Sequence, residues 1–152
     1  MKNQIFFDKV SESISKYKTT GLKETPVIRS STDSFKIFLQ EYEEDLYDVE
    51  HFYVLFLNRA NKPIVIKKIS SGGMTGTVVD IRVVLRYGII CKATSMVLCH
   101  NHPSGNLKPS QADIDLTKKI KQAGAIMDIQ VIDHIVIGDE SNYYSFADEG
   151  LI

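Results

Sequence analysis

Two imidazoles, a hydroxyl and a carboxylate lie close together in this sequence, at His100, His102, Ser110 and Asp113. Imidazole nitrogens and carboxylate oxygens are ligands that zinc accepts, and three protein ligands leave a fourth position open for water, as in catalytic zinc sites. A metal held in this way lowers the pKa of a bound water so that it can attack a substrate. The spacing therefore predicts zinc-assisted hydrolysis, with His100, His102 and Asp113 as the metal ligands.

The residues around the two histidines predict how they are positioned. Residues 95–99 form a short apolar run typical of a buried strand. Side chains alternate between the two faces of a strand, so His100 and His102 are expected on one face, converging on one point. Pro103 and Gly105 then predict a sharp turn.

A helix is predicted directly after this turn, over residues 111–123, with Gly124 as its end. Ser110 and Asp113 match the Ser-x-x-Asp capping-box pattern at a helix start, which alone would explain both residues without a metal. The two histidines upstream favour a ligand role for Asp113. Ser110 can serve both as the helix cap and as a site residue.

The rest of the chain alternates helices with strands. Further helices are predicted over residues 32–44, with Ser30 or Ser31 as N-cap, and over 78–91. Strands are predicted over residues 10–17, 50–57, 63–69, 129–137 and 143–146, with a hairpin turn at 58–61. A hairpin combined with strand–helix alternation predicts one α/β (α+β) domain, a mixed sheet flanked by helices in three layers.

Composition and charge narrow the classes of protein. The chain has 152 residues, of which 43% are hydrophobic and 24% charged, as in an ordinary globular domain. The formal net charge of -1 offers no basic field for nucleic acid, and no apolar run is long enough to span a membrane. Asp8 and Lys9 interrupt any signal-peptide core, so a cytoplasmic location is expected. Cys91 and Cys99 are interpreted as small buried apolar residues.

A hydrolytic metal site also needs a base that takes a proton from the water. Glu50 opens the apolar run over residues 50–57, where composition alone favours a solvated strand end. A carboxylate at this position is costly unless it reaches the surface or a functional site.

The motifs together resemble the JAMM (MPN-plus) metalloprotease superfamily and, within it, the RadC-like bacterial JAB-domain proteins. The superfamily pattern is an upstream Glu, then His-x-His, seven residues, Ser, two residues and Asp, and this chain matches it without a gap from His100 to Asp113. The RadC-like branch is matched further by residues 52–58, 69–72, 100–105, 133–138 and 144–150. The resemblance covers the chain from Glu50 to its C-terminus.

For the architecture, the resemblance implies a JAB/MPN-type (cytidine-deaminase-like) three-layer domain over residues 49–152. Residues 1–48 are then an N-terminal extension, a strand and a helix packed on that core. Typical relatives carry an N-terminal helix-hairpin-helix region, and the residues before Glu50 lack its glycine-containing hairpins.

For the chemistry, the resemblance implies that Zn2+ is the cofactor and that Glu50 is the general base. Ser110 would steady the catalytic water and the oxyanion. The implied activity is that of a peptidase or isopeptidase with a peptide or protein substrate. His134 is outside the superfamily's ligand set and is interpreted either as a residue that contacts the ligands or as a core residue, with the core favoured.

Two other functions stay open. The first is a role in DNA repair, recombination or mobile elements, in which a RadC-like protein acts with nucleic acid. Electrostatic binding to DNA grows with the number of phosphates neutralised, so weak binding without sequence preference is expected of this chain. The second is an inactive scaffold, against which the presence of all five site residues argues. The sequence predicts neither the substrate nor the oligomeric state.

Overall fold

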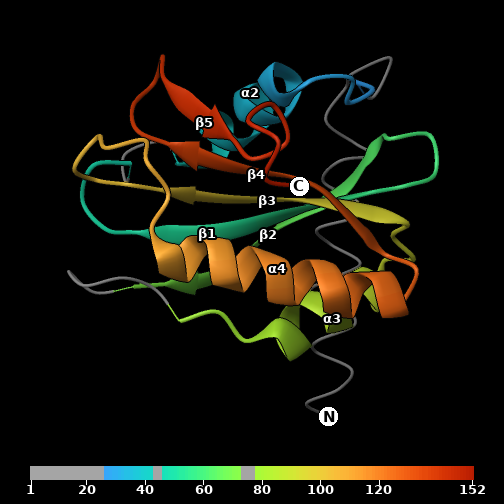
Figure 1. The fold of residues 1–152 in the computed structure, drawn as a ribbon. Helices are drawn as coiled ribbons and strands as arrows, with labels where there is room; N and C mark the ends of the chain where they lie inside the picture. Colours follow the sequence, from blue (N-terminus) through green and yellow to red (C-terminus); the bar gives the residue numbers. More distant parts are fainter. Residues whose placement is uncertain (1–25, 43–45, 73–77) are drawn as a thin grey trace, which may run out of the picture.

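The computed structural model describes residues 26–42, 46–72 and 78–152 (Figure 1). Its helices are α2 (Ser31–Tyr42), α3 (Ile81–Ile90) and α4 (Gln111–Ile126). Its strands are β1 (His51–Leu57), β2 (Pro63–Ser71), β3 (Ser95–Asn101), β4 (Gln130–Ile137) and β5 (Tyr143–Ser145). The strand expected over residues 10–17 lies outside the described ranges. None of the helices in these ranges combines the length and apolar character needed to cross a bilayer.

The strands form one five-stranded sheet in the order β2-β1-β3-β4-β5. β1 and β2 make the expected hairpin, and β1 pairs antiparallel with β3 on its other side. β4 runs parallel to β3, and α4 makes the long crossover connection that two parallel neighbours require. The predicted mixed sheet is therefore confirmed.

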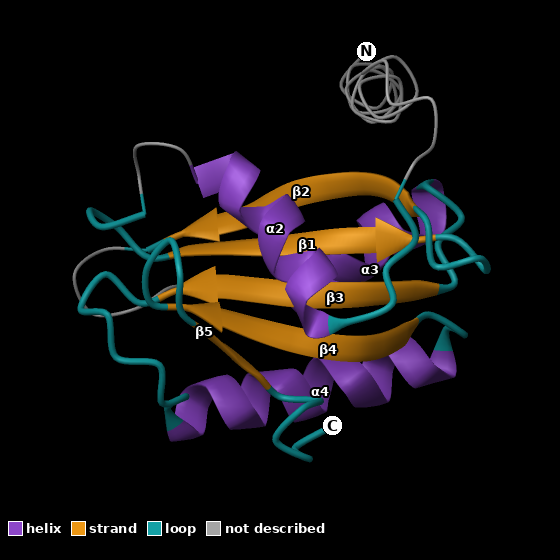
Figure 2. Ribbon diagram, turned by 90° about the horizontal axis from the view of Figure 1, so that it is seen from above, coloured by secondary structure: helices purple, strands orange, loops and turns teal. Residues whose placement is uncertain are grey.

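Helices cover both faces of this sheet, which gives three layers (Figures 1 and 2). α2 lies across one face, where Phe38 packs in a core with Leu55 and alternate residues of the neighbouring strands. α3 and α4 cover the other face, where Val84 and Ile120 pack in a second core. Because both faces are covered, β1 and β3 are buried along their whole length. Both cysteines are buried, as expected, one in each core.

Side-chain caps set the starts of two helices. Ser30 caps α2, because its hydroxyl accepts the Asp33 amide at 3.3 Å while the Asp33 carboxylate accepts the Ser30 amide at 3.1 Å. α3 begins at Ile81, later than predicted, because the Asp80 side chain accepts the Arg82 amide at 2.9 Å and caps the helix there.

The end of α4 differs from the prediction. Gly124 does not end this helix, which continues to Ile126. The left-handed residue after the helix is Asp128, with φ 56°, and Asp is one of the few residue types that adopt this conformation readily. Gly124 instead allows close packing of α4 on the sheet, because a Cβ at this position would overlap the carbonyl oxygen of Ile129.

Candidate metal centre

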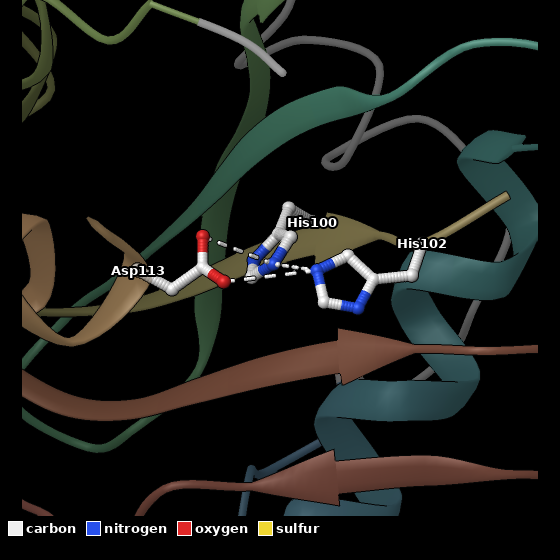
Figure 3. Close-up of side chains that lie close together, drawn as sticks. All are labelled: His100, His102 and Asp113. Carbon is white, nitrogen blue, oxygen red and sulfur yellow. Dashed lines mark hydrogen bonds and ion pairs between the residues drawn. The ribbon is translucent and has the colours of Figure 1, made fainter. Parts of the chain in front are cut away.

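The end of β3 and the start of α4 bring the three predicted metal ligands together (Figure 3). His100 lies within β3, His102 follows the end of that strand, and Asp113 is in the first turn of α4. The Nε2 atoms of His100 and His102 are 3.0 Å apart. Asp113 Oδ1 is 3.5 Å from His100 Nε2, and Asp113 Oδ2 is 3.7 Å from His102 Nε2.

These separations fit a metal ion. Ligand atoms at about 2.0–2.2 Å from a tetrahedral metal are about 3.3–3.6 Å from one another, close to the observed values. Within the described ranges, these three residues form the one group of histidines, cysteines and acids that could hold a metal. His100 is buried, whereas the side chains of His102 and Asp113 are each 16% exposed, so the cluster faces solvent on one side.

The electrostatics of the cluster also favour a cation. Burial raises the pKa of Asp113, but its contacts with His100, His102 and Ser110 outweigh the burial and hold the pKa well below its usual range. The contact with Asp113 raises the pKa of His102, partial burial lowers it, and the Asn106 carbonyl and the Asp113 charge raise it further. The carboxylate therefore stays ionised, as metal ligation requires.

Ser110 forms the predicted capping box with Asp113. The Ser110 hydroxyl accepts the Asp113 amide at 3.1 Å, and the Asp113 carboxylate accepts the Ser110 amide at 2.6 Å. The same hydroxyl donates to Asp113 Oδ2 at 2.7 Å, so it also contacts the cluster of predicted metal ligands. The capping interpretation and the proximity to the cluster are therefore both correct. The catalytic role of Ser110 stays a prediction.

Glu50 lies directly before β1, the strand that pairs with the histidine strand. Its carbonyl accepts the Gly72 amide at 2.8 Å, which extends the pairing of β1 with β2. Phe52 is opposite His100 in the sheet, with the two rings stacked at 6.3 Å. Alternation places Glu50 on the same face as Phe52. The Glu50 charge raises the pKa of His102, but Glu50 is not a member of the ligand group. Its role as a base stays a prediction.

Asn101, between the two histidines, holds the segment that carries Glu50. It is completely buried. Its Oδ1 accepts the His51 amide at 2.7 Å, and its Nδ2 donates to the carbonyls of Leu46 at 2.8 Å and Val49 at 2.9 Å. This contribution was not predicted from the sequence, although Asn101 is the middle residue of the His-x-His motif and its side chain must point to the opposite face.

His134 contacts one of the predicted metal ligands, His100. Its Nε2 is 2.8 Å from His100 Nδ1, and its Nδ1 is 2.6 Å from Thr117 Oγ1. The ring is buried between Phe52 and Phe146, and this burial lowers the pKa of His134 well below its usual value, with the charge of His100 acting in the same direction. His134 is therefore both a buried core residue and a residue that contacts a predicted ligand, the two alternatives that the sequence left open. Thr117 was missed altogether.

The chain as a whole is similar to one described family. The family model "RadC-like JAB domain" matches residues 28–151. A curated relative from Flavobacterium johnsoniae, named "UPF0758 protein", is 52% identical over 124 residues, which are 82% of this chain and 53% of the relative. Another of the same name from Porphyromonas gingivalis is 37% identical over 132 residues, 86% of this chain and 58% of the relative. The chain thus spans about half the length of these relatives. It belongs to the RadC-like JAB domain family.

Proposed function

We propose that this protein is a zinc-dependent hydrolase that cleaves peptide or isopeptide bonds. The observation that supports it is the convergence of two imidazole nitrogens and one carboxylate, 3.0 to 3.7 Å apart, in a partly exposed cluster at the end of β3 and the start of α4. Two histidines with one carboxylate are a donor set of catalytic zinc sites, whereas magnesium and calcium prefer oxygen ligands alone. Membership of a JAB-domain family supports the same proposal.

Zinc bound by these residues would supply Lewis acidity, which polarises a carbonyl and lowers the pKa of water to about 7. Glu50 takes the proton from the attacking water and passes it to the leaving amine, as a general base and then a general acid. Its position on the face shared with His100 suits this role. Ser110 has one hydroxyl proton, which it donates to Asp113 Oδ2 in the structure and would donate to the developing oxyanion in the reaction.

A combined metal and peptidase measurement tests the proposal. The zinc-loaded protein is compared with Glu50→Gln and His102→Ala on a panel of peptides and of isopeptide-linked lysine substrates. We expect Glu50→Gln to keep its zinc and to lose about 10²–10⁴-fold in hydrolysis. His102→Ala should lose the metal. Equal zinc in His102→Ala and the wild type, or full activity of Glu50→Gln, would contradict the proposal.

The alternative role with nucleic acid is less well supported. It would require a continuous basic surface, and one basic cluster, Lys67 and Lys68, lies on the edge strand β2. Adjacent strand residues point to opposite faces, and these two ammonium groups lie over different rings, Tyr87 at 5.5 Å and Tyr53 at 5.4 Å. The pair therefore does not make one stripe. Tight DNA binding by this chain at physiological salt would favour the alternative.

A further inference from the structure

We infer that His134 and Thr117 are positioning residues that fix the tautomer of His100, so that His100 Nε2 keeps its lone pair for a metal. These three residues lie on β4, α4 and β3, and are linked by hydrogen bonds in one direction. The inference rests on the proposed metal site and does not depend on which bond is hydrolysed.

The direction of the hydrogen bonds is set at Thr117. Its Oγ1 lies 2.6 Å from the backbone carbonyl oxygen of Asp113, which can only accept. A hydroxyl has one proton, so Thr117 donates it to Asp113. The bond of 2.6 Å between Thr117 Oγ1 and His134 Nδ1 must then be donated by the imidazole, and His134 carries its proton on Nδ1.

The burial of His134 determines which nitrogen of His100 carries the proton. His134 has no exposed surface, and its ring lies between Phe146, stacked at 4.7 Å, and Phe52, edge-on at 5.6 Å. A doubly protonated ring here would be a charge in an apolar environment, so the ring is neutral and its Nε2 can only accept. His100 Nδ1, at 2.8 Å, therefore donates to it, and His100 Nε2 keeps its lone pair.

His102 reaches the same state through a different partner. Its Nδ1 is 2.5 Å from the carbonyl oxygen of Asn106, which can only accept, so the His102 proton lies on Nδ1. Both Nε2 lone pairs then face each other across 3.0 Å, an arrangement that is repulsive until a cation lies between them. The chain of hydrogen bonds that orients His100 starts at the backbone carbonyl of Asp113, which is itself a predicted ligand. This chain therefore links the start of α4 to β3.

The test uses Thr117→Val, which removes the hydroxyl and keeps the side-chain shape, and Thr117→Ser, which keeps the hydroxyl. Imidazole nitrogen NMR of the metal-free protein at about pH 8, above the ordinary histidine pKa, reports the His100 tautomer. Competition with a chelator reports zinc affinity. We expect His100 to have the Nδ1–H tautomer in the wild type and in Thr117→Ser. Thr117→Val should show mixed tautomers and about tenfold weaker zinc binding, and His134→Phe about 10–100-fold weaker binding.

Ser145→Ala is the matched control, because it also removes a buried hydroxyl hydrogen bond, 2.7 Å from Asp133 on the opposite face of β4. We expect it to leave zinc affinity unchanged. The inference is overturned if Thr117→Val keeps the wild-type tautomer and zinc affinity, or if Ser145→Ala weakens zinc binding as much. A wild type that binds no zinc, but whose His100 tautomer depends on Thr117, would overturn the proposed zinc hydrolase and still support the assignment of Thr117 and His134 as the residues that fix this tautomer.

Discussion

Replacement of Asn101 by alanine should destabilise the protein far more than the loss of one ordinary surface contact. The Asn101 amide is completely buried, donates both of its protons to backbone carbonyls and accepts one backbone amide. Asn101→Ala would leave the buried His51 amide and the carbonyls of Leu46 and Val49 without these partners.

The size of the effect follows from these three groups. A buried donor or acceptor that loses its partner costs about 1–3 kcal/mol, and water can enter part of the space that the amide leaves. We therefore expect the free energy of unfolding to fall by about 3–5 kcal/mol, a large part of the about 5–15 kcal/mol typical of a domain. Because the three backbone groups flank Glu50, hydrolysis should fall more than zinc uptake.

Urea unfolding of the metal-free protein measures this loss, with Asn58→Ala as the control. Asn58 also accepts two backbone amides, from Ala60 at 2.8 Å and Lys62 at 3.1 Å, but it lies in the turn between β1 and β2, where water can replace it. The control should lose about 0.5–1.5 kcal/mol. If Asn101→Ala lost no more than Asn58→Ala, burial of the Asn101 hydrogen bonds would not be what stabilises this segment.

Three further outcomes are expected. Ser110→Ala should lose about 0.5–2 kcal/mol of stability in thermal unfolding, as a helix N-cap, and about 10²–10³-fold in hydrolysis. Gly124→Ala should destabilise by about 1–3 kcal/mol because its Cβ meets the backbone of Ile129, whereas Gly88→Ala, whose Cβ meets only side-chain atoms at 3.0 Å or more, should cost less in the same assay. Zinc affinity measured by calorimetry should rise with pH through and above about 6.5, because the pKa of His102 is raised and its proton competes with the metal up to a higher pH. An affinity that did not change with pH would contradict this assignment of His102 as a ligand.

Local patterns in the sequence were sufficient to predict the cluster of His100, His102 and Asp113 and most of the helices and strands. Two features of the cluster depend on neighbouring residues alone: the same-face placement of His100 and His102, and the capping box at Ser110 and Asp113. Their geometry could therefore be inferred before any tertiary contact was known. The apolar run over residues 50–57 likewise predicts a strand, which the structure places at His51–Leu57. The base role of Glu50 came from the family resemblance, since composition favoured a solvated strand end.

Only the tertiary structure determined what surrounds those ligands. The parallel pairing of β3 with β4 places His134 opposite Leu98 and within hydrogen-bonding distance of His100, although nothing in the local sequence of either strand sets that register. α4 adds Thr117 from a third element. From the sequence, Gly124 predicts a helix end, yet the close approach of α4 to the sheet requires a glycine inside the helix. Such contacts depend on how separate elements pack, and packing is decided by the whole core.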